Sequence, residues 1–114
     1  MAVTLRQLEV LVAVLDRGGF GAAADQLTMS QSSVSHSLAS LEREVDGALV
    51  ERTTPVRGTP LGEALIPHAR AMLAAMRGFQ ASAAAHHDAQ ISAPIGLGVP
   101  PTAARGLLPN LLVA

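Results

Sequence analysis

The sequence predicts a mainly α-helical fold in which three short helices and a small β-hairpin precede one long helix. Three observations carry this prediction. Apolar side chains recur at three- and four-residue steps over residues 5–15, 34–45 and 61–83, which is the spacing of one helix face. Serine, threonine and glycine stand where those stretches begin and end. Proline and glycine punctuate a strand-like stretch at residues 49–59, as a tight turn requires.

The composition favours a soluble protein with an aliphatic core. Hydrophobic residues make up 49% of the 114 residues, but only 2% are aromatic. The chain has no cysteine, which excludes disulfides and thiolate metal sites. No stretch has the pattern of a signal peptide or of a transmembrane helix. We therefore expect a cytoplasmic protein with no membrane partner.

The charge of the chain argues weakly against nucleic-acid binding. The formal net charge is −1, and no lysine is present. Residues 1–58 hold five arginines and seven acidic residues, which gives this part a net charge of −2. Attraction to phosphate is therefore weak unless the arginines cluster on one face. A DNA-binding interpretation has to rest on the motifs.

The first helix has a clear beginning and end. Thr4 and Gln7 have the spacing of a capping box, in which each side chain bonds the other residue's backbone N–H. Gly18 and Gly19 then end the helix. Its apolar face consists of Leu5, Leu8, Leu11, Val12 and Leu15.

A second, shorter helix is expected from about Ala22 to Leu27, and a turn at residues 28–30 separates it from a third. Ser30 is a favourable N-cap for the third helix, and Gly47 marks its exit. The third helix has an apolar stripe and an opposite, polar side. The stripe is Val34, Leu38, Leu41 and Val45, and the opposite side is Ser32, His36, Ala39, Ser40 and Arg43.

A hairpin and a long helix follow. Leu49–Thr53 is strand-like, and Arg57 is placed near the tip or on the return arm of the hairpin. Thr59 and Pro60 then open the long helix, as a hydroxyl cap followed by proline at the first helical position. Pro67 removes one backbone hydrogen bond inside this helix and predicts a kink or local loosening.

The long helix carries an apolar seam with heptad-like spacing, which predicts contact with a partner helix. The alternative is that the same side chains only cover the core of the preceding helices. The pattern continues beyond the surface that so small a core offers, which favours a dimer. The residues assigned to dimerisation are Leu61, Leu65, Ala69, Met72, Met76 and Phe79.

Two short helices joined by a tight turn, the second with a polar face, form a helix-turn-helix, and the hairpin makes it winged. The chain resembles the N-terminal part of LysR-type transcriptional regulators over roughly residues 3–114. The residues that carry the resemblance are Phe20, Ala23, Ala24, Leu27, Ser30, Gln31, Val34, Ser35, Leu38, Leu41, Glu42, Leu49, Arg52, Thr59 and Gly62.

The resemblance implies three parts. Residues 1–58 are the winged helix-turn-helix DNA-binding domain, residues 59–88 are the linker and dimerisation helix, and residues 89–114 are the truncated start of an α/β effector-binding domain. It implies a regulator that binds double-stranded DNA as a homodimer at an inverted-repeat promoter site. A tetramer of the full-length protein is left open. A small-molecule inducer is expected only where the effector domain is present.

The expected DNA contacts lie on the third helix and on the wing. The first residues of a recognition helix reach base edges in the major groove, and Gln31 has the amide that pairs bidentately with adenine. The assigned residues are Ser30, Gln31, Ser32, Ser33, Ser35, His36 and Ser40 on the helix, and Arg52, Thr53, Thr54 and Arg57 on the wing. The alternative is a solvated helix face with Ser30 only as a cap, and Arg52 paired with Glu51 or Glu42.

Catalysis and metal binding have no supporting pattern. Ser35 and His36 lack an acid partner or a nucleophile elbow. Adjacent His86 and His87 do not share a helix face, and no further ligands gather near them. We expect no enzyme, no cofactor and no metal. The alternative function is a dimerising protein-interaction fragment that does not bind DNA usefully, which the charge of residues 1–58 motivates.

Overall fold

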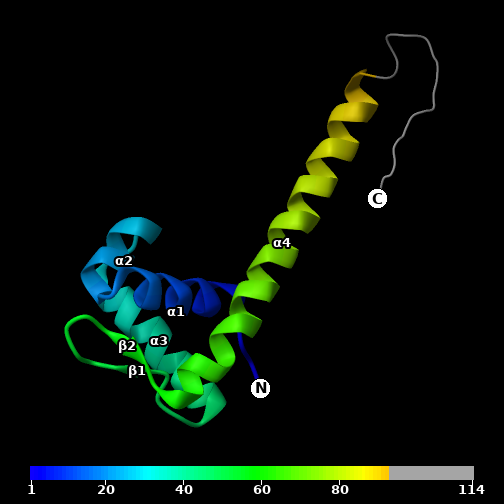
Figure 1. Ribbon diagram of the computed structural model, residues 1–114. Helices are drawn as coiled ribbons and strands as arrows, with labels where there is room; N and C mark the ends of the chain where they lie inside the picture. The colour runs from blue at the N-terminus through cyan, green and yellow to red at the C-terminus, as the bar shows by residue number, and fades with distance from the viewer. Residues whose placement is uncertain (93–114) are drawn as a thin grey trace. The chain divides into compact units, whose positions relative to one another are not determined.

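The structure of the chain, a computed structural model, describes residues 1–92 (Figure 1). It contains α1 (Leu5–Arg17), α2 (Phe20–Leu27), α3 (Gln31–Val45), β1 (Val50–Glu51), β2 (Arg57–Gly58) and α4 (Pro60–Ser92). The predicted fold class, a winged helix-turn-helix followed by a long helix, is confirmed. Helix α4 continues to Ser92, past the predicted boundary at residue 88. The rest of the predicted effector-domain segment, from residue 93 onward, lies outside the described residues.

The chain divides into two units, Met1–Ala74 and Ala75–Ala114. The first holds α1, α2, α3, the hairpin and the beginning of α4. In the second, α4 continues from Ala75 to Ser92. Side chains 75–89 of that helix are exposed, apart from the half-buried Met76.

Helix α1 begins and ends as the sequence predicts. The Thr4 hydroxyl accepts the Gln7 backbone N–H at 3.1 Å, and the Thr4 N–H donates to Gln7 Oε1 at 2.9 Å. At the other end Gly18 has a positive φ of 73° and donates its N–H to the Val14 carbonyl. Glycine adopts this left-handed conformation without steric cost, so the chain can turn sharply into α2.

Helix α2 begins two residues earlier than predicted, at Phe20. Gly19 is its N-cap, with an extended backbone and no side-chain hydrogen bond. An N-cap without a hydroxyl or carboxamide leaves no sequence signal for the start, which explains the error. Inside α2, Ala23 and Ala24 are buried, and their short side chains allow the neighbouring helices to pack closely.

The core of the first unit lies where α1, α2 and α3 meet and extends under the wing and the first turns of α4. It contains no aromatic residue, as expected from the composition. Each fully buried valine or leucine contributes about 1.5–3 kcal/mol relative to an exposed one. The buried apolar residues are Leu8, Val10, Leu11, Ala13, Val14, Ala23, Ala24, Val34, Leu38, Leu41, Leu49, Val50, Ala69 and Leu73.

The hairpin is shorter than predicted. β1 and β2 are antiparallel, with Val50 opposite Gly58 and Glu51 opposite Arg57. Beyond these pairs the backbone turns toward α1, where the Val56 N–H donates to the Gly18 carbonyl at 2.9 Å. Because that N–H bonds the end of a helix and not the opposite strand, the ladder stops after two residues.

Helix α4 begins at a close contact with the residues before β1. The Thr59 hydroxyl accepts the Gly62 N–H at 3.0 Å and donates to the Ala48 carbonyl at 2.6 Å. A Cβ atom at Gly62 would overlap the Leu49 carbonyl oxygen. Only glycine allows this approach. The helix then continues through Pro67 without interruption.

One ion pair joins α1 to α4. The Arg70 guanidinium donates to both Asp16 carboxylate oxygens, at 2.5 and 3.0 Å. These hydrogen bonds hold the pKa of Asp16 below its ordinary value, although partial burial opposes them. The two side chains are 50% and 44% exposed, so solvent screens the pair and its contribution to stability is small.

Replacing Gly62 with alanine should destabilise the first unit. The added methyl group overlaps the Leu49 carbonyl, so the backbone must shift, at a cost on the order of 1–3 kcal/mol. Gly21→Ala is the matched control, because a Cβ there meets only Gln31 Oε1 at an ordinary 3.5 Å. Alanine in place of a helical glycine stabilises by roughly 0.5–1 kcal/mol. Thermal unfolding followed by circular dichroism should move the two melting temperatures in opposite directions. Equal melting temperatures would refute the close contact.

Replacing Asp16 with asparagine should lower the free energy of unfolding at neutral pH by about 1 kcal/mol or less. Because the folded-state pKa of Asp16 is lowered, its stabilisation is present above the unfolded-state pKa of about 3.9. It is lost as the pH falls through the folded-state pKa. Urea titrations should show a difference between the variants at pH 7 that shrinks as the pH is lowered. Asp25→Asn is the control, since exposed Asp25 forms no salt bridge within residues 1–92. A difference that persists at low pH would contradict the assignment.

Candidate nucleic-acid interface

The first turn of α3 is held by its own serines. Ser30 is the N-cap, and its hydroxyl accepts the Ser33 N–H at 3.1 Å and donates to Ser33 Oγ at 2.8 Å. Ser32 Oγ lies 3.2 Å from the same hydroxyl. The capping role predicted for Ser30 is confirmed. Ser30 and Ser33 therefore reach an external partner only through the lone pairs that these bonds leave free.

The outward side of the first two turns of α3 is open to solvent. Gln31, Ser32, Ser33 and His36 are exposed, and Ser35 is half-buried. None of these residues carries a fixed charge, so the positive end of the helix dipole is the local attraction for an anion. The carboxamide oxygen of Gln31 lies near the first turn of α2, 3.5 Å from where a Cβ on Gly21 would stand. The hydrogen-bonding groups of these α3 side chains are thus open to solvent beside the turn that joins α2 to α3.

Ser40 has a different environment from the other assigned serines. It is half-buried, and its hydroxyl accepts a hydrogen bond from Gln7 Nε2 at 3.2 Å. Gln7 is 8% exposed, and its carboxamide oxygen already accepts the Thr4 N–H. A buried carboxamide without partners costs free energy, so Ser40 has a structural role that the sequence did not reveal. Its assignment to DNA stays a prediction.

Arg52 is held by an aromatic ring. Its guanidinium carbon lies 4.6 Å from the centre of the Phe20 ring, in a cation–π contact. The alternative of a salt bridge with Glu51 or Glu42 is not found within residues 1–92. The Glu42 carboxylate accepts the Leu49 N–H at 2.8 Å instead. Arg52 remains exposed, so the contact positions its charge without removing it from solvent.

The rest of the wing is solvent-exposed. The Thr53 hydroxyl donates to the Pro55 carbonyl at 2.8 Å and fixes the turn. Thr54 is exposed at the tip. Arg57 lies on β2, opposite Glu51, with its side chain in solvent. The structure therefore keeps Arg52 and Arg57 on one small hairpin that is fastened to α1 and α2.

Three structural contacts of this region were not predicted. Phe20 holds Arg52, Glu42 holds the backbone before β1, and Gln7 holds Ser40. Each contact joins residues that are at least seven positions apart, so no local pattern signals it. One sequence signal was present for Phe20, since an aromatic residue is rare in this chain.

The apolar seam of α4 divides between the core and the surface. Leu61 and Leu65 are half-buried against the core of the first unit, and Ala69 is only 2% exposed. The prediction that Ala69 forms a dimer contact is wrong, because its side chain has no surface left for a partner. Met72 and Phe79 are exposed, and Met76 is half-buried. For these three, dimerisation stays a prediction.

Other kinds of site find no support in the described residues. Within residues 1–92, no group of three or more histidine and acidic side chains is placed to hold a metal ion. None of the helices described here combines the length and the apolar character needed to cross a membrane.

The profile of the bacterial regulatory helix-turn-helix proteins of the lysR family matches residues 5–63. This stretch runs from the start of α1 to the first turn of α4 and includes both helices of the motif and the wing. The chain belongs to the LysR family. Its resemblance to LysR-type regulators, stated above from individual residues, is thereby confirmed.

Two mycobacterial relatives match nearly the whole chain. A probable hydrogen peroxide-inducible genes activator of Mycobacterium xenopi is 42% identical over 110 residues, which are 96% of this chain and 58% of the relative. The protein of the same description from Mycobacterium leprae is 40% identical over 96% of this chain and 35% of its own length. This LysR-family chain thus spans less than two thirds of the length of these relatives.

Solved structures agree in fold. The oxidized form of Corynebacterium glutamicum OxyR superposes with a TM-score of 0.70 at 39% identity, over 73% of this chain and 27% of that one. The BenM DBD/catB site 1 DNA complex gives a TM-score of 0.70 at 30% identity, over 74% of this chain and 96% of the BenM chain. The LysR-family winged helix-turn-helix of this chain therefore resembles domains solved alone with DNA and within longer regulators.

Replacing Ser40 with alanine should lower the free energy of unfolding by about 1 kcal/mol, because Gln7 loses a hydrogen-bond partner. If the Ser40 hydroxyl acts only within the fold, the affinity for DNA should not change under conditions in which the variant is fully folded. Ser37→Ala, on the same helix and also half-buried, is the control for serine loss. Urea titration and fluorescence anisotropy of a labelled duplex separate the two effects. A loss of DNA affinity with unchanged stability would assign Ser40 to the interface instead.

Proposed function

We propose that this LysR-family chain recognises a specific double-stranded DNA site through the first turns of α3 and through the wing. The observation that carries the proposal is the likeness to BenM DBD in complex with catB site 1 DNA, at 30% identity over 96% of that chain. The polar, solvent-open side of α3 supports it, because an apolar protein partner would not be matched by serine and glutamine side chains.

We assign base recognition to the exposed residues near the beginning of α3. The groove of B-DNA that admits a helix is the major groove, and there a glutamine carboxamide pairs with both N6 and N7 of adenine. Gln31 has this group on the first helical position. Ser32 on the same turn, and Ser35 and His36 on the next, reach bases or phosphates. The N–H groups of the first turn that remain free point at a phosphate.

The wing supplies positive charge that the first two turns of α3 lack. Arg57 is exposed on β2 and contacts phosphate or enters the minor groove. Arg52 adds a second charge, with its direction set by Phe20. Because residues 1–58 have a net charge of −2, non-specific binding is weak. Most of the discrimination must then come from contacts with bases.

A homodimer is suited to the proposed recognition of DNA. Two copies related by a twofold axis present two recognition helices to two half-sites of an inverted repeat. Met72, Met76 and Phe79 of α4 are the apolar residues left for the partner once Ala69 is assigned to the core. An inducer response and a tetrameric assembly would require an effector domain joined to this part.

A second candidate is a fragment that dimerises and does not discriminate DNA sequences. The observation that favours it is the negative net charge of residues 1–58. It predicts a folded dimer with equal, feeble affinity for specific and scrambled duplexes. An enzymatic function is not proposed, since the relatives named above are regulators.

Anisotropy titrations with DNA from upstream of the chain's own gene, and with a scrambled duplex, test the proposal over a salt series. The unmodified chain should prefer the upstream duplex, with an affinity that falls as salt rises. Equal affinity for both duplexes, from a folded dimer, would favour the second candidate.

Two substitutions separate the two kinds of contact. Gln31→Ala should reduce the preference for the specific duplex, at a cost of about 1–3 kcal/mol. Arg57→Ala should weaken binding to both duplexes alike and lower the slope of affinity against salt by about one. Arg6→Ala is the control for charge, because Arg6 pairs with Glu9 at the N-terminal end of α1. Unchanged binding by both interface variants would refute the assigned contacts.

A further inference from the structure

One polar stripe of α3 continues beyond the residues assigned to DNA. This stripe consists of Ser32, His36, Ala39 and Arg43. At 3.6 residues per turn, its members fall within about 60° of one another around the helix axis. Ala39 is half-buried, and the other three are exposed. The exposed stripe thus ends in an arginine, in the last turn of α3, that the proposed contacts do not include.

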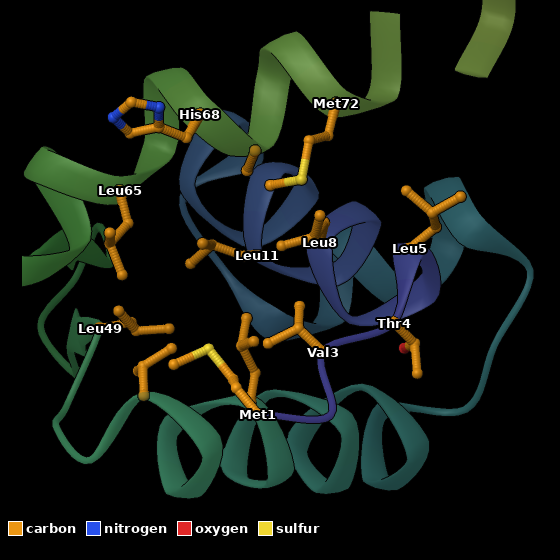
Figure 2. A pocket seen from close by; sticks show the side chains of 13 residues that line it. Met1, Val3, Thr4, Leu5, Leu8, Leu11, Leu49, Leu65, His68 and Met72 are labelled. Carbon is orange, nitrogen blue, oxygen red and sulfur yellow. The ribbon is translucent and has the colours of Figure 1, made fainter. Parts of the chain in front are cut away.

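The opposite side of α3, at the level of Arg43, faces the interior of the first unit. Leu41 and Val45 line an apolar pocket that lies among α1, α3 and the first turns of α4 (Figure 2). Each of these two residues is about 160° from Arg43 around the helix axis, and Leu41 is only 2% exposed. Arg43 is therefore directed away from the core, on the side that carries Ser32 and His36.

The guanidinium of Arg43 is not used by the fold. None of the salt bridges found within residues 1–92 involves it. The two neighbouring carboxylates have other partners. Glu42 accepts the Leu49 N–H at 2.8 Å, and Glu44 accepts the Ala2 N–H at 2.7 Å. The N–H donors of Arg43 are therefore left for solvent or for a ligand with acceptor oxygens.

We propose that Arg43 binds a DNA phosphate at the border of the major groove, while the first turn of α3 meets the bases. This inference rests on the proposed function and adds a contact to it. Ser32 and Arg43 lie about 16 Å apart along the helix axis, and the major groove is about 12 Å wide. A recognition helix that inserts its N-terminal residues into the groove can therefore touch the phosphate backbone with its C-terminal end, a geometry that other helix-turn-helix proteins use.

Two properties of the stripe suit a phosphate. The guanidinium of arginine stays charged at any physiological pH, and its planar fork of N–H groups matches two phosphate oxygens. Ala39, about one turn before Arg43, has no side chain beyond Cβ, so it leaves room for the sugar–phosphate backbone beside the helix. Arg43 thus brings a fixed positive charge to a helix whose first two turns have none.

A purely structural role for Arg43 predicts a different behaviour. A cation in the last turn of a helix stabilises that helix through its dipole, and Arg43 stands at such a position. In that case Arg43→Gln should lower the melting temperature and leave the DNA affinity of the folded protein unchanged. A phosphate contact instead lowers the affinity and its dependence on salt.

Anisotropy titrations of the Arg43→Gln variant over a salt series test the contact. Glutamine keeps a long side chain and a high helix propensity but removes the charge, so the variant should fold, as circular dichroism checks. It should bind the upstream and the scrambled duplex about fivefold to tenfold more weakly at 0.1 M salt. The slope of log affinity against log salt should fall by about one. A slope equal to that of the unmodified chain overturns the proposal.

Two control variants separate charge at this position from charge in general. Arg43→Lys keeps a cation at the same place and should keep the slope. Arg6→Ala removes one positive charge from the N-terminal end of α1 and should also keep the slope. A fall in slope with Arg6→Ala as large as with Arg43→Gln would show an effect of net charge alone and would overturn the contact.

Ethylation interference on the upstream duplex locates the contact. Ethylation of a phosphate that Arg43 binds weakens the unmodified chain, but it should no longer weaken Arg43→Gln, which has already lost that contact. At least one phosphate should therefore stop interfering with the variant. An interference pattern identical to that of the unmodified chain overturns a direct contact, even where the salt slope has fallen.

The outcomes distinguish this contact from the proposed function. If Gln31→Ala and Arg57→Ala act as expected while Arg43→Gln keeps the slope of the unmodified chain, only the Arg43 contact is overturned. If the unmodified chain does not distinguish the two duplexes, the proposed recognition fails. The salt slope on either duplex then still decides the Arg43 contact, because binding to phosphate does not depend on sequence. A folded chain that binds neither duplex overturns both.

Discussion

The position of Leu49 constrains the rest of the first unit. Its side chain is fully buried, its N–H donates to the Glu42 carboxylate, and its carbonyl accepts the Thr59 N–H. That carbonyl also lies against the Cα of Gly62. One residue therefore connects the end of α3, the wing and the beginning of α4. If it moves, the direction of the wing and that of the first turns of α4 change together, and the candidate interface changes with them.

In the candidate interface, α3 presents polar side chains while its own N-terminus is capped from within the chain. The donors of the first turn of α3 are partly satisfied by Ser30, so the helix does not depend on a ligand to complete its N-terminus. Gln31 and His36 are left exposed. The wing is fastened separately, through Val56 to α1 and through Arg52 to Phe20. On α3 the capping bonds of Ser30 and the exposed groups of Gln31 and His36 thus belong to different side chains, whereas on the wing Arg52 makes the fastening contact and stays exposed.

Helix α4 serves two purposes along its length. Its first turns complete the core through Ala69 and Leu73, and the Arg70–Asp16 pair joins them to α1. Beyond Ala75 the exposed side chains are mostly small, with Phe79 as the large apolar exception. One apolar repeat in the sequence of α4 therefore corresponds to two surfaces in the structure: a buried one before Ala75 and an exposed one beyond it. Periodicity gives the face of a helix but not the identity of what covers that face.

The sequence by itself determined the elements whose signals are local. The Thr4 capping box, the Ser30 cap and the Thr59–Pro60 start all depend on residues within one turn of the helix end, and each was predicted correctly. The tertiary structure alone decided the pairing of distant side chains: Arg52 with Phe20, Ser40 with Gln7, and Ala69 with the core. These contacts arise because folding brings together residues far apart in the chain. The sequence pattern shows which residues are apolar and how they are spaced, but it does not show which distant residues come into contact.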